Sequence, residues 1–273
     1  MPSDPIQHWT LADLDFAAID REAVRSDENL FYLACSASFV ESGSDLYTHN
    51  LVDYFQGDEE VTTWLSEQWE KEELQHGEAL RAYVNHVWPE FDWEPAYRSF
   101  LEEYSAYCKV ELLEPSRALE MSARCVVETG TATYYRALAR AVHEPVFADL
   151  ANRIANDEVN HYKNFYRFFK AYREREQLGR ARVFRTVARR TWEFKSEDAD
   201  CAIRNIARTR SPELANDPAY LRDVGSRMAR TVSRNLHVGN TLKMLMRPLD
   251  LHPRVEAVVQ FPVEQFMQRV FLR

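Results

Sequence analysis

Two short segments of this chain place a glutamate and a histidine three residues apart inside long helical patterns. They are Glu73-x-x-His76 and Glu158-x-x-His161. Positions i and i+3 are neighbours on one face of a helix, so both side chains of a pair can reach one metal ion. Each pair also falls in the apolar stripe of its helix, which is expected to face the core. The apolar members are Leu65, Trp69, Leu80 and Tyr83 in the first stripe, and Ile154, Phe165 and Phe168 in the second.

Two further helical patterns carry a lone glutamate in the stripe expected to face inward. Glu128 shares its stripe with apolar residues, and Glu41 shares its stripe mainly with small ones. An unpaired buried carboxylate costs several kcal/mol, so four of them require compensating charge. Two metal ions would supply that charge. The other stripe members are Met121, Cys125, Ala132 and Tyr135 with Glu128, and Ala34, Ala37, Ser44, Thr48 and Phe55 with Glu41.

The order of these residues along the chain strengthens the metal hypothesis. A single Glu-x-x-His pair is a weak signal, because about one such pair is expected by chance in a chain of this composition. Here a helix with a single inward-facing Glu is followed by a helix with a Glu-x-x-His pair, and this order occurs twice. Glu73 stands 32 positions after Glu41 in the first half, and Glu158 stands 30 positions after Glu128 in the second. This is the ligand set of a ferritin-like di-iron carboxylate bundle. The alternative, a helical bundle with exposed glutamates and core histidines, fits less well because all four stripes face inward.

The sequence therefore predicts an all-α fold, with a ferritin-like four-helix core and additional C-terminal helices. Only seven glycines occur in 273 residues, which also favours helices. We expect a single domain with an N-terminal arm (1–26), a core (27–178) and additional helices (181–273). Capping residues, prolines and glycines predict the helix bounds. The expected helices are 27–56, 58–87, about 97–113 as an insertion, 115–143, 144–178, 181–208, 217–246 and 253–271.

Composition narrows the possible environment and partners. No apolar run approaches the roughly 18 residues of a membrane span, and no signal peptide is recognisable, so a cytoplasmic protein is expected. The four cysteines form no C-x-x-C pair and are expected to be reduced. Residues 171–273 carry 20 Lys and Arg against 12 Asp and Glu, a net of +8, which leaves −17 for residues 1–170. The basic third fits a solvated Arg-rich surface better than a surface that docks an acidic protein or a nucleic acid.

Residues beside the expected ligands suggest supporting roles. Asp157 and Glu72 each precede a ligand glutamate and are placed to accept the free N–H of the histidine in the opposite half. Three mid-helix glycines within two residues of a ligand indicate room for close helix approach or for a substrate. They are Gly43, Gly77 and Gly130. Trp9 is a candidate for an electron route by residue type alone.

Within the di-iron superfamily, residues 30–170 most resemble the soluble acyl carrier protein desaturases. The segment Glu72-Glu73-x-x-His76-Gly77 is similar to the Glu-Glu-x-x-His-Gly of that family, and Asp157-Glu158-x-x-His161 to its Asp-Glu-x-x-His. Tyr47, six residues after Glu41, falls where the family keeps a tyrosine. Thr131, three residues after Glu128, falls where it keeps an active-site threonine. The C-terminal region does not match the family pattern.

This resemblance implies an O₂-activating di-iron oxidoreductase that desaturates an acyl chain. The six ligands would be Glu41, Glu73, His76, Glu128, Glu158 and His161, holding two iron ions or a manganese–iron pair. Thr131 would assist proton delivery. The implied partners are O₂, an acyl carrier protein or small-molecule substrate, a ferredoxin-type electron donor and a second copy in a homodimer. Alternatives are a hydroxylase or N-oxygenase acting on a small molecule or tRNA, and an iron-oxidising ferritin-like protein.

Overall fold

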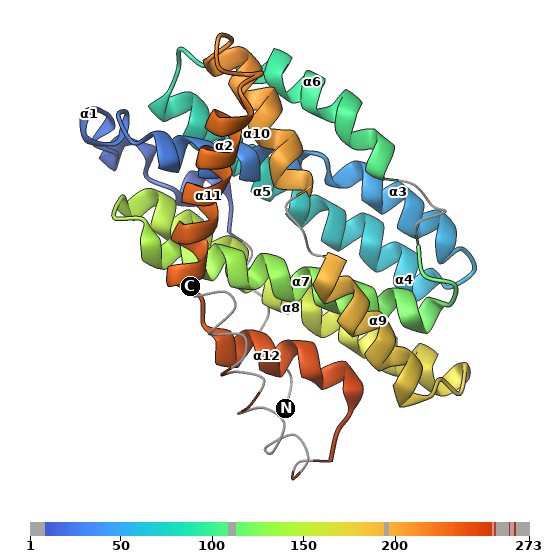
Figure 1. Cartoon of the computed structure of the whole chain (residues 1–273). Helices are drawn as coiled ribbons and strands as arrows, with labels where there is room; N and C mark the ends of the chain where they lie inside the picture. The colour runs from blue at the N-terminus through green and yellow to red at the C-terminus, as the bar shows by residue number, and fades with distance from the viewer. Residues whose placement is uncertain are drawn as a thin grey trace.

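The computed structural model describes residues 9–108, 113–193 and 197–252, together with the single positions 254, 262 and 265. Helices account for the regular structure of these residues, which contain no strand (Figure 1). This confirms the all-α fold predicted from the sequence. None of the described helices is long and apolar enough to cross a bilayer.

The core of the bundle consists of two antiparallel helix pairs. Helix α2 (Glu28–Ser42) packs against α5 (Glu70–Val87), and α7 (Arg117–Ala141) packs against α8 (Pro145–Arg175). The pairs lie side by side, and α5 contacts α8 (Figure 1). Side-chain caps at Asp27, Ser116 and Glu144 begin three of these helices by accepting backbone N–H groups of the first turn. Large apolar clusters fill the interior on both sides of the bundle centre.

The first core helix is interrupted, whereas the sequence predicted one helix over 27–56. Helix α2 ends at Ser42, and α3 (Ser44–Tyr54) begins directly after Gly43. A break of this kind frees backbone carbonyls at the end of the first segment. The Tyr97 hydroxyl donates to the Ser42 carbonyl at 2.6 Å, which satisfies one of them. The interruption is therefore stabilised by a residue more than fifty positions away in the sequence.

The second core helix runs from α4 (Glu59–Trp64) into α5 through a π-helical turn, Leu65–Trp69. This continuity agrees with the helix predicted over 58–87. A π turn adds one residue to the helical repeat, and such turns are frequent at functional sites. Trp64, directly before the turn, and Trp69 at its end both pack against Phe165 of α8.

The peripheral helices begin and end elsewhere than the sequence predicted. Helix α6 (Trp93–Tyr104) starts earlier than the expected 97, because Pro95 lies in its first turn, where the missing N–H is not needed. The expected helix 217–246 is divided into α11 (Pro218–Arg234) and α12 (Val238–Met246). The Asn235 amide donates to the Thr231 carbonyl at the end of α11, an interaction that competes with helix continuation.

The expected helix 181–208 is likewise described as α9 (Arg180–Glu193) and α10 (Glu197–Arg210). Helices α9, α11 and α12 pack on α7, while α10 packs on α2 and α6 (Figure 1). A short helix α1 (Arg21–Val24) follows two 3₁₀ turns in the N-terminal arm. The helix expected over 253–271 lies almost wholly outside the described residues.

Candidate metal centre

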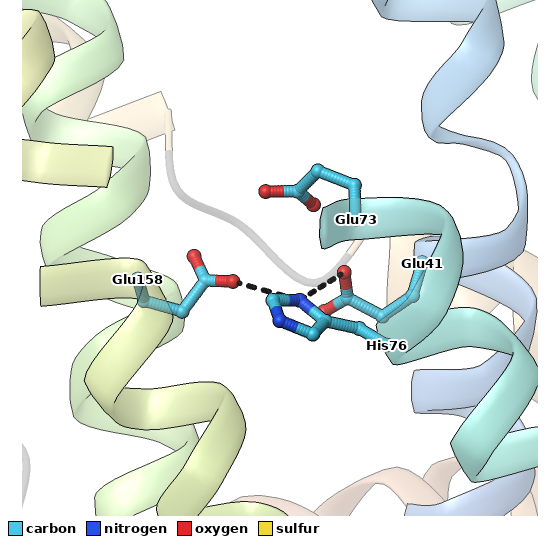
Figure 2. A group of neighbouring side chains, drawn as sticks. All are labelled: Glu41, Glu73, His76 and Glu158. Carbon is cyan, nitrogen blue, oxygen red and sulfur yellow. Dashed lines mark ion pairs between the residues drawn. The ribbon is translucent and has the colours of Figure 1, made fainter. Parts of the chain in front are cut away.

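All four core helices contribute to one buried cluster of carboxylates and imidazoles. The cluster contains all six residues that the sequence nominated as ligands, and each is at most 8% exposed. They come from α2 (Glu41), α5 (Glu73 and His76), α7 (Glu128) and α8 (Glu158 and His161). Figure 2 shows four of them converging from three helices.

The six side chains form two overlapping groups, each with ligand atoms within 4.8 Å of one another. The first contains Glu41 and His76 and is called here the first metal position. The second contains Glu128 and His161 and is called the second metal position. Glu73 and Glu158 belong to both groups. The geometry therefore offers two terminal ligands at each position and two carboxylates placed to bridge them, which is the pattern of a two-metal carboxylate site.

Distances within the cluster define which imidazole nitrogen faces each position. At the first position, His76 Nδ1 lies 3.3 Å from Glu158 Oε1 and 3.9 Å from Glu41 Oε2 (Figure 2). At the second, His161 Nδ1 lies 3.0 Å from Glu73 Oε1 and 3.6 Å from Glu128 Oε2. Both Nδ1 atoms thus face the carboxylates in the interior.

Four buried atoms of this cluster have no hydrogen-bond partner. They are Nδ1 of His76, Nδ1 of His161, Oε2 of Glu128 and Oε1 of Glu158. Their mutual contacts are close but lack hydrogen-bond geometry. Unsatisfied buried polar atoms are rare in native proteins because each loses its hydration without replacement. A pair of divalent cations would satisfy all four atoms together and neutralise four carboxylates, so the donor set fits a two-metal centre.

The pKa shifts of the clustered side chains also indicate that the carboxylates need nearby positive charge. Burial raises the pKa of Glu41 and of Glu128, and neighbouring carboxylates raise both further. Burial alone would lower the pKa of His76, but the hydrogen bond to Asp157 and the adjacent carboxylate of Glu158 raise it to about 10. For Glu158, the close approach of His76 and the charges of both imidazoles outweigh burial and lower the pKa to about 2. The carboxylates therefore require nearby protons or cations.

The outward-facing nitrogens of the two histidines are held by carboxylates from the opposite half of the bundle. His76 Nε2 lies 3.1 Å from Asp157 Oδ2, and His161 Nε2 lies 2.7 Å from Glu72 Oε2. A hydrogen bond at Nε2 fixes the ring orientation and leaves Nδ1 free to bind a metal. The sequence nominated Asp157 and Glu72 for this contact.

These two carboxylates have partners of their own. The Trp9 indole N–H donates to Asp157 Oδ2 at 2.6 Å, and its ring stacks parallel to that of His76 at a centroid distance of 6.1 Å. On the other side, the Gln68 amide donates to Glu72 Oε1 at 3.3 Å. The N-terminal arm therefore reaches the cluster through Trp9.

The two other nominated residues lie in different surroundings. The Thr131 hydroxyl donates to Glu158 Oε2 and is also 3.3 Å from the backbone carbonyls of Val127 and Glu128. The Tyr47 hydroxyl instead hydrogen-bonds to the hydroxyl of Tyr104 on α6. Tyr47 thus joins α3 to α6, and the hydrogen bond described for it reaches no ligand side chain.

One residue in contact with a ligand was not recognised from the sequence. The Tyr135 hydroxyl, on α7, donates to Glu41 Oε1 on α2. Tyr135 is 1% exposed. It stands seven residues after Glu128, two helical turns along the same stripe, and this spacing was the available signal. Tyrosine is common in apolar stripes as a packing residue. The spacing therefore does not predict that the Tyr135 hydroxyl donates to a ligand.

A close approach of two helices sets the separation of Glu41 and His76. Ser42 follows Glu41, Gly77 follows His76, and a Cβ built on Gly77 would lie 2.7 Å from the backbone nitrogen of Ser42 and 2.8 Å from its Cα. No side chain fits there. Gly43 has no such crowding, since the atoms nearest to a Cβ at that position are 3.6 Å away. The sequence left two explanations open for these glycines, close packing of helices or room for a substrate. Gly77 permits close packing of α2 and α5.

Comparison with known proteins supports the superfamily and no narrower assignment. Residues 118–220 match the Rubrerythrin family model, a ferritin-like di-iron group. The matched region includes α7 and α8 with Glu128, Glu158 and His161, but not the first half of the bundle. A search of curated proteins found no significant match. The chain therefore carries a ferritin-like helical bundle with a carboxylate–histidine cluster, and the match gives no specific support to the desaturases.

Proposed function

We propose that this protein is an O₂-activating di-iron oxidoreductase with one ion at each metal position. The observation that carries the proposal is the set of four buried, unpartnered ligand atoms within a cluster of four carboxylates and two imidazoles. A stability role alone gives no reason to bury so many acceptors around a common space.

The donor set favours iron, with a manganese–iron pair as the alternative. Carboxylate and imidazole ligands without thiolates suit both metals. Glu41 and His76 would hold one ion, Glu128 and His161 the other, and Glu73 and Glu158 would bridge them. When bound, reduced iron supplies the electrons that activate O₂.

The surrounding side chains have separate tasks in this proposal. Asp157 and Glu72 keep the two imidazole rings oriented with Nδ1 inward. The Thr131 hydroxyl holds a proton beside Glu158 at the edge of the cluster. Trp9 extends the hydrogen-bonded line from His76 through Asp157 into the N-terminal arm. We propose that electrons from a ferredoxin-type donor enter along this line.

The substrate proposal rests on the resemblance alone. The motifs around Glu73 and Glu158 favour desaturation of an acyl chain, either carrier-bound or as a small molecule. Hydroxylation or N-oxygenation of a small molecule or tRNA would use the same centre. A homodimer is part of this proposal because the resembling family implies it. The Rubrerythrin match specifies no substrate, and a second candidate is therefore a ferritin-like protein that oxidises and binds iron itself.

Metal content tests the core of the proposal. The wild-type protein, loaded with ferrous iron without oxygen and then desalted, is expected to retain about two ions per chain. Glu158→Ala removes a ligand common to both positions and is expected to lose both ions. The matched control is Glu78→Ala, which removes an exposed glutamate from α5 and should retain them. Wild-type protein without stoichiometric metal would refute the proposal.

Product analysis then separates the reactions. The iron-loaded protein is given O₂, a reductant and a carrier-bound acyl chain, and the products are analysed by mass spectrometry. Loss of two hydrogen atoms from the chain would indicate desaturation, and gain of one oxygen atom would indicate hydroxylation. Rapid oxidation of excess ferrous iron, with every offered organic substrate unchanged, would favour iron oxidation.

A further inference from the structure

Two hydroxyl groups of α7, one helical turn apart, donate to carboxylates of the cluster. Thr131 donates to Glu158, and Tyr135 donates to Glu41. Both acceptors are buried, and the bond from Tyr135 is itself buried and so protected from competition by water, whereas the bond from Thr131 is part-buried. Such a bond restricts rotation of the carboxylate and stabilises its ionised form.

These donors are distributed unequally over the two metal positions. Glu41 and Glu158 both belong to the first position. For Glu73 and Glu128 the described contacts include no hydroxyl, amide or guanidinium donor, and both lie near Nδ1 of His161. Oε2 of Glu128 has no hydrogen-bond partner. The terminal carboxylate thus accepts a hydroxyl hydrogen bond at the first position, and no such bond is described at the second.

The backbone adds to this difference. The contact between Ser42 and Gly77 fixes the spacing of the helices that carry Glu41 and His76, the terminal ligands of the first position. A preorganised set of ligands loses less conformational entropy when a metal ion binds. The first position therefore has both a fixed backbone and a fixed carboxylate.

We propose that the two positions bind metal unequally, that the first position fills first, and that Tyr135 is the positioning residue responsible. This proposal rests on the two-ion centre proposed above. Glu158 serves both positions, so its bond from Thr131 strengthens both. The bond from Tyr135 reaches only Glu41 and favours the first position alone. At low metal supply, the protein would hold one ion beside Glu41 and His76.

Stepwise titration of the metal-free protein with Co(II) under anaerobic conditions tests the order. Calorimetry gives the two affinities, and visible absorption reports the coordination of each ion. Two steps are expected for the wild type, at least tenfold apart in dissociation constant. Glu128→Ala should retain the tighter step, and Glu41→Ala should retain only the weaker one. Circular dichroism verifies that each variant keeps its helices.

Conservative variants of the hydroxyl donors test the cause. Tyr135→Phe is expected to weaken the first step about 10- to 100-fold, the usual effect of losing an outer hydrogen bond to a ligand, and to leave the second unchanged. Tyr134→Phe is the matched control, because no hydrogen bond to a ligand is described for its hydroxyl. Thr131→Val should weaken both steps. Thr133→Val, whose hydroxyl contacts Thr241, should weaken neither.

The outcomes separate this proposal from the one on which it rests. Two ions bound with equal affinity would refute the proposed order while leaving the two-metal centre intact. An unequal pair of steps that Tyr135→Phe leaves unchanged, or weakens equally, would refute the role of Tyr135. Failure to bind two ions at any concentration would refute the two-metal centre itself, and this proposal with it.

Discussion

Replacing Gly77 with alanine should disturb both the packing of the bundle and the first metal position. The added Cβ would lie 2.6 Å from the Ser42 side-chain oxygen and 2.7–2.8 Å from two Ser42 backbone atoms. The side-chain oxygen can rotate away, but the backbone atoms cannot. Ordinary contact begins at 3.4 Å. The two helices must therefore separate by about 0.6–0.7 Å, the difference between these distances.

The energetic cost follows from two opposing effects. Forcing an extra methyl group into a packed interior costs about 1–3 kcal/mol, and the upper end applies because the crowded atoms are backbone. Alanine recovers about 1 kcal/mol as the better helix former. The net loss of unfolding free energy is then about 2 kcal/mol, which corresponds to a fall in melting temperature of roughly 4–8 °C for a domain of this size.

The same displacement moves Glu41 away from His76. Metal sites tolerate ligand distances only within about 0.2 Å, so a shift of this size should weaken the first metal position by roughly tenfold or more. Thermal unfolding of the metal-free protein and Co(II) titration measure the two effects separately. Gly43→Ala is the matched control, since a Cβ there has its nearest atoms at 3.6 Å and requires no movement. If Gly77→Ala melted and bound metal like this control, the packing argument would be wrong.

Three other variants test separate parts of the structure. Glu128→Ala should remove the ion at the second metal position and leave the helix content of the metal-free protein unchanged by circular dichroism; loss of the fold with metal content retained would contradict its role as a ligand. Asp157→Asn should weaken metal binding about 10- to 100-fold in calorimetry, because a neutral amide holds the His76 ring more weakly than a carboxylate and makes it less basic. Arg124→Met leaves the fully buried Glu120 unpaired and should cost about 3–5 kcal/mol in urea unfolding. Restoring much of that loss by adding Glu120→Gln would attribute it to the unpaired charge, and no recovery would contradict this.

The candidate ligands were accessible from the sequence because helical periodicity is a local property. A glutamate in an otherwise apolar stripe must face the core wherever the helix packs, so Glu41, Glu73, Glu128 and Glu158 were identifiable without knowledge of the fold. The two half-bundles and the long core helices were also predictable, from helical periodicity and from the capping residues. The π turn at Leu65–Trp69 did not alter this result, because the helix continues through it.

The helix interruptions were not accessible in the same way. The break at Gly43 is stabilised by the hydroxyl of Tyr97. The helix predicted over 97–113 begins too late, because a proline such as Pro95 fits both an irregular segment and the first turn of a helix. A glycine or an asparagine within a helical pattern is compatible with both continuation and interruption. Distant contacts decide between these outcomes.

Local patterns along the chain are enough to predict the helical class and the inward-facing side chains, because both depend on residues within a few turns of one another. How those side chains meet depends on contacts between helices that are far apart in the sequence. The tertiary structure paired Tyr135 with Glu41, 94 residues apart, and turned the Tyr47 hydroxyl toward Tyr104. Such pairs depend on the rotation and spacing of whole helices, and these are set by contacts such as that between Gly77 and Ser42. The unequal support of the two metal positions is therefore a property of the assembled bundle.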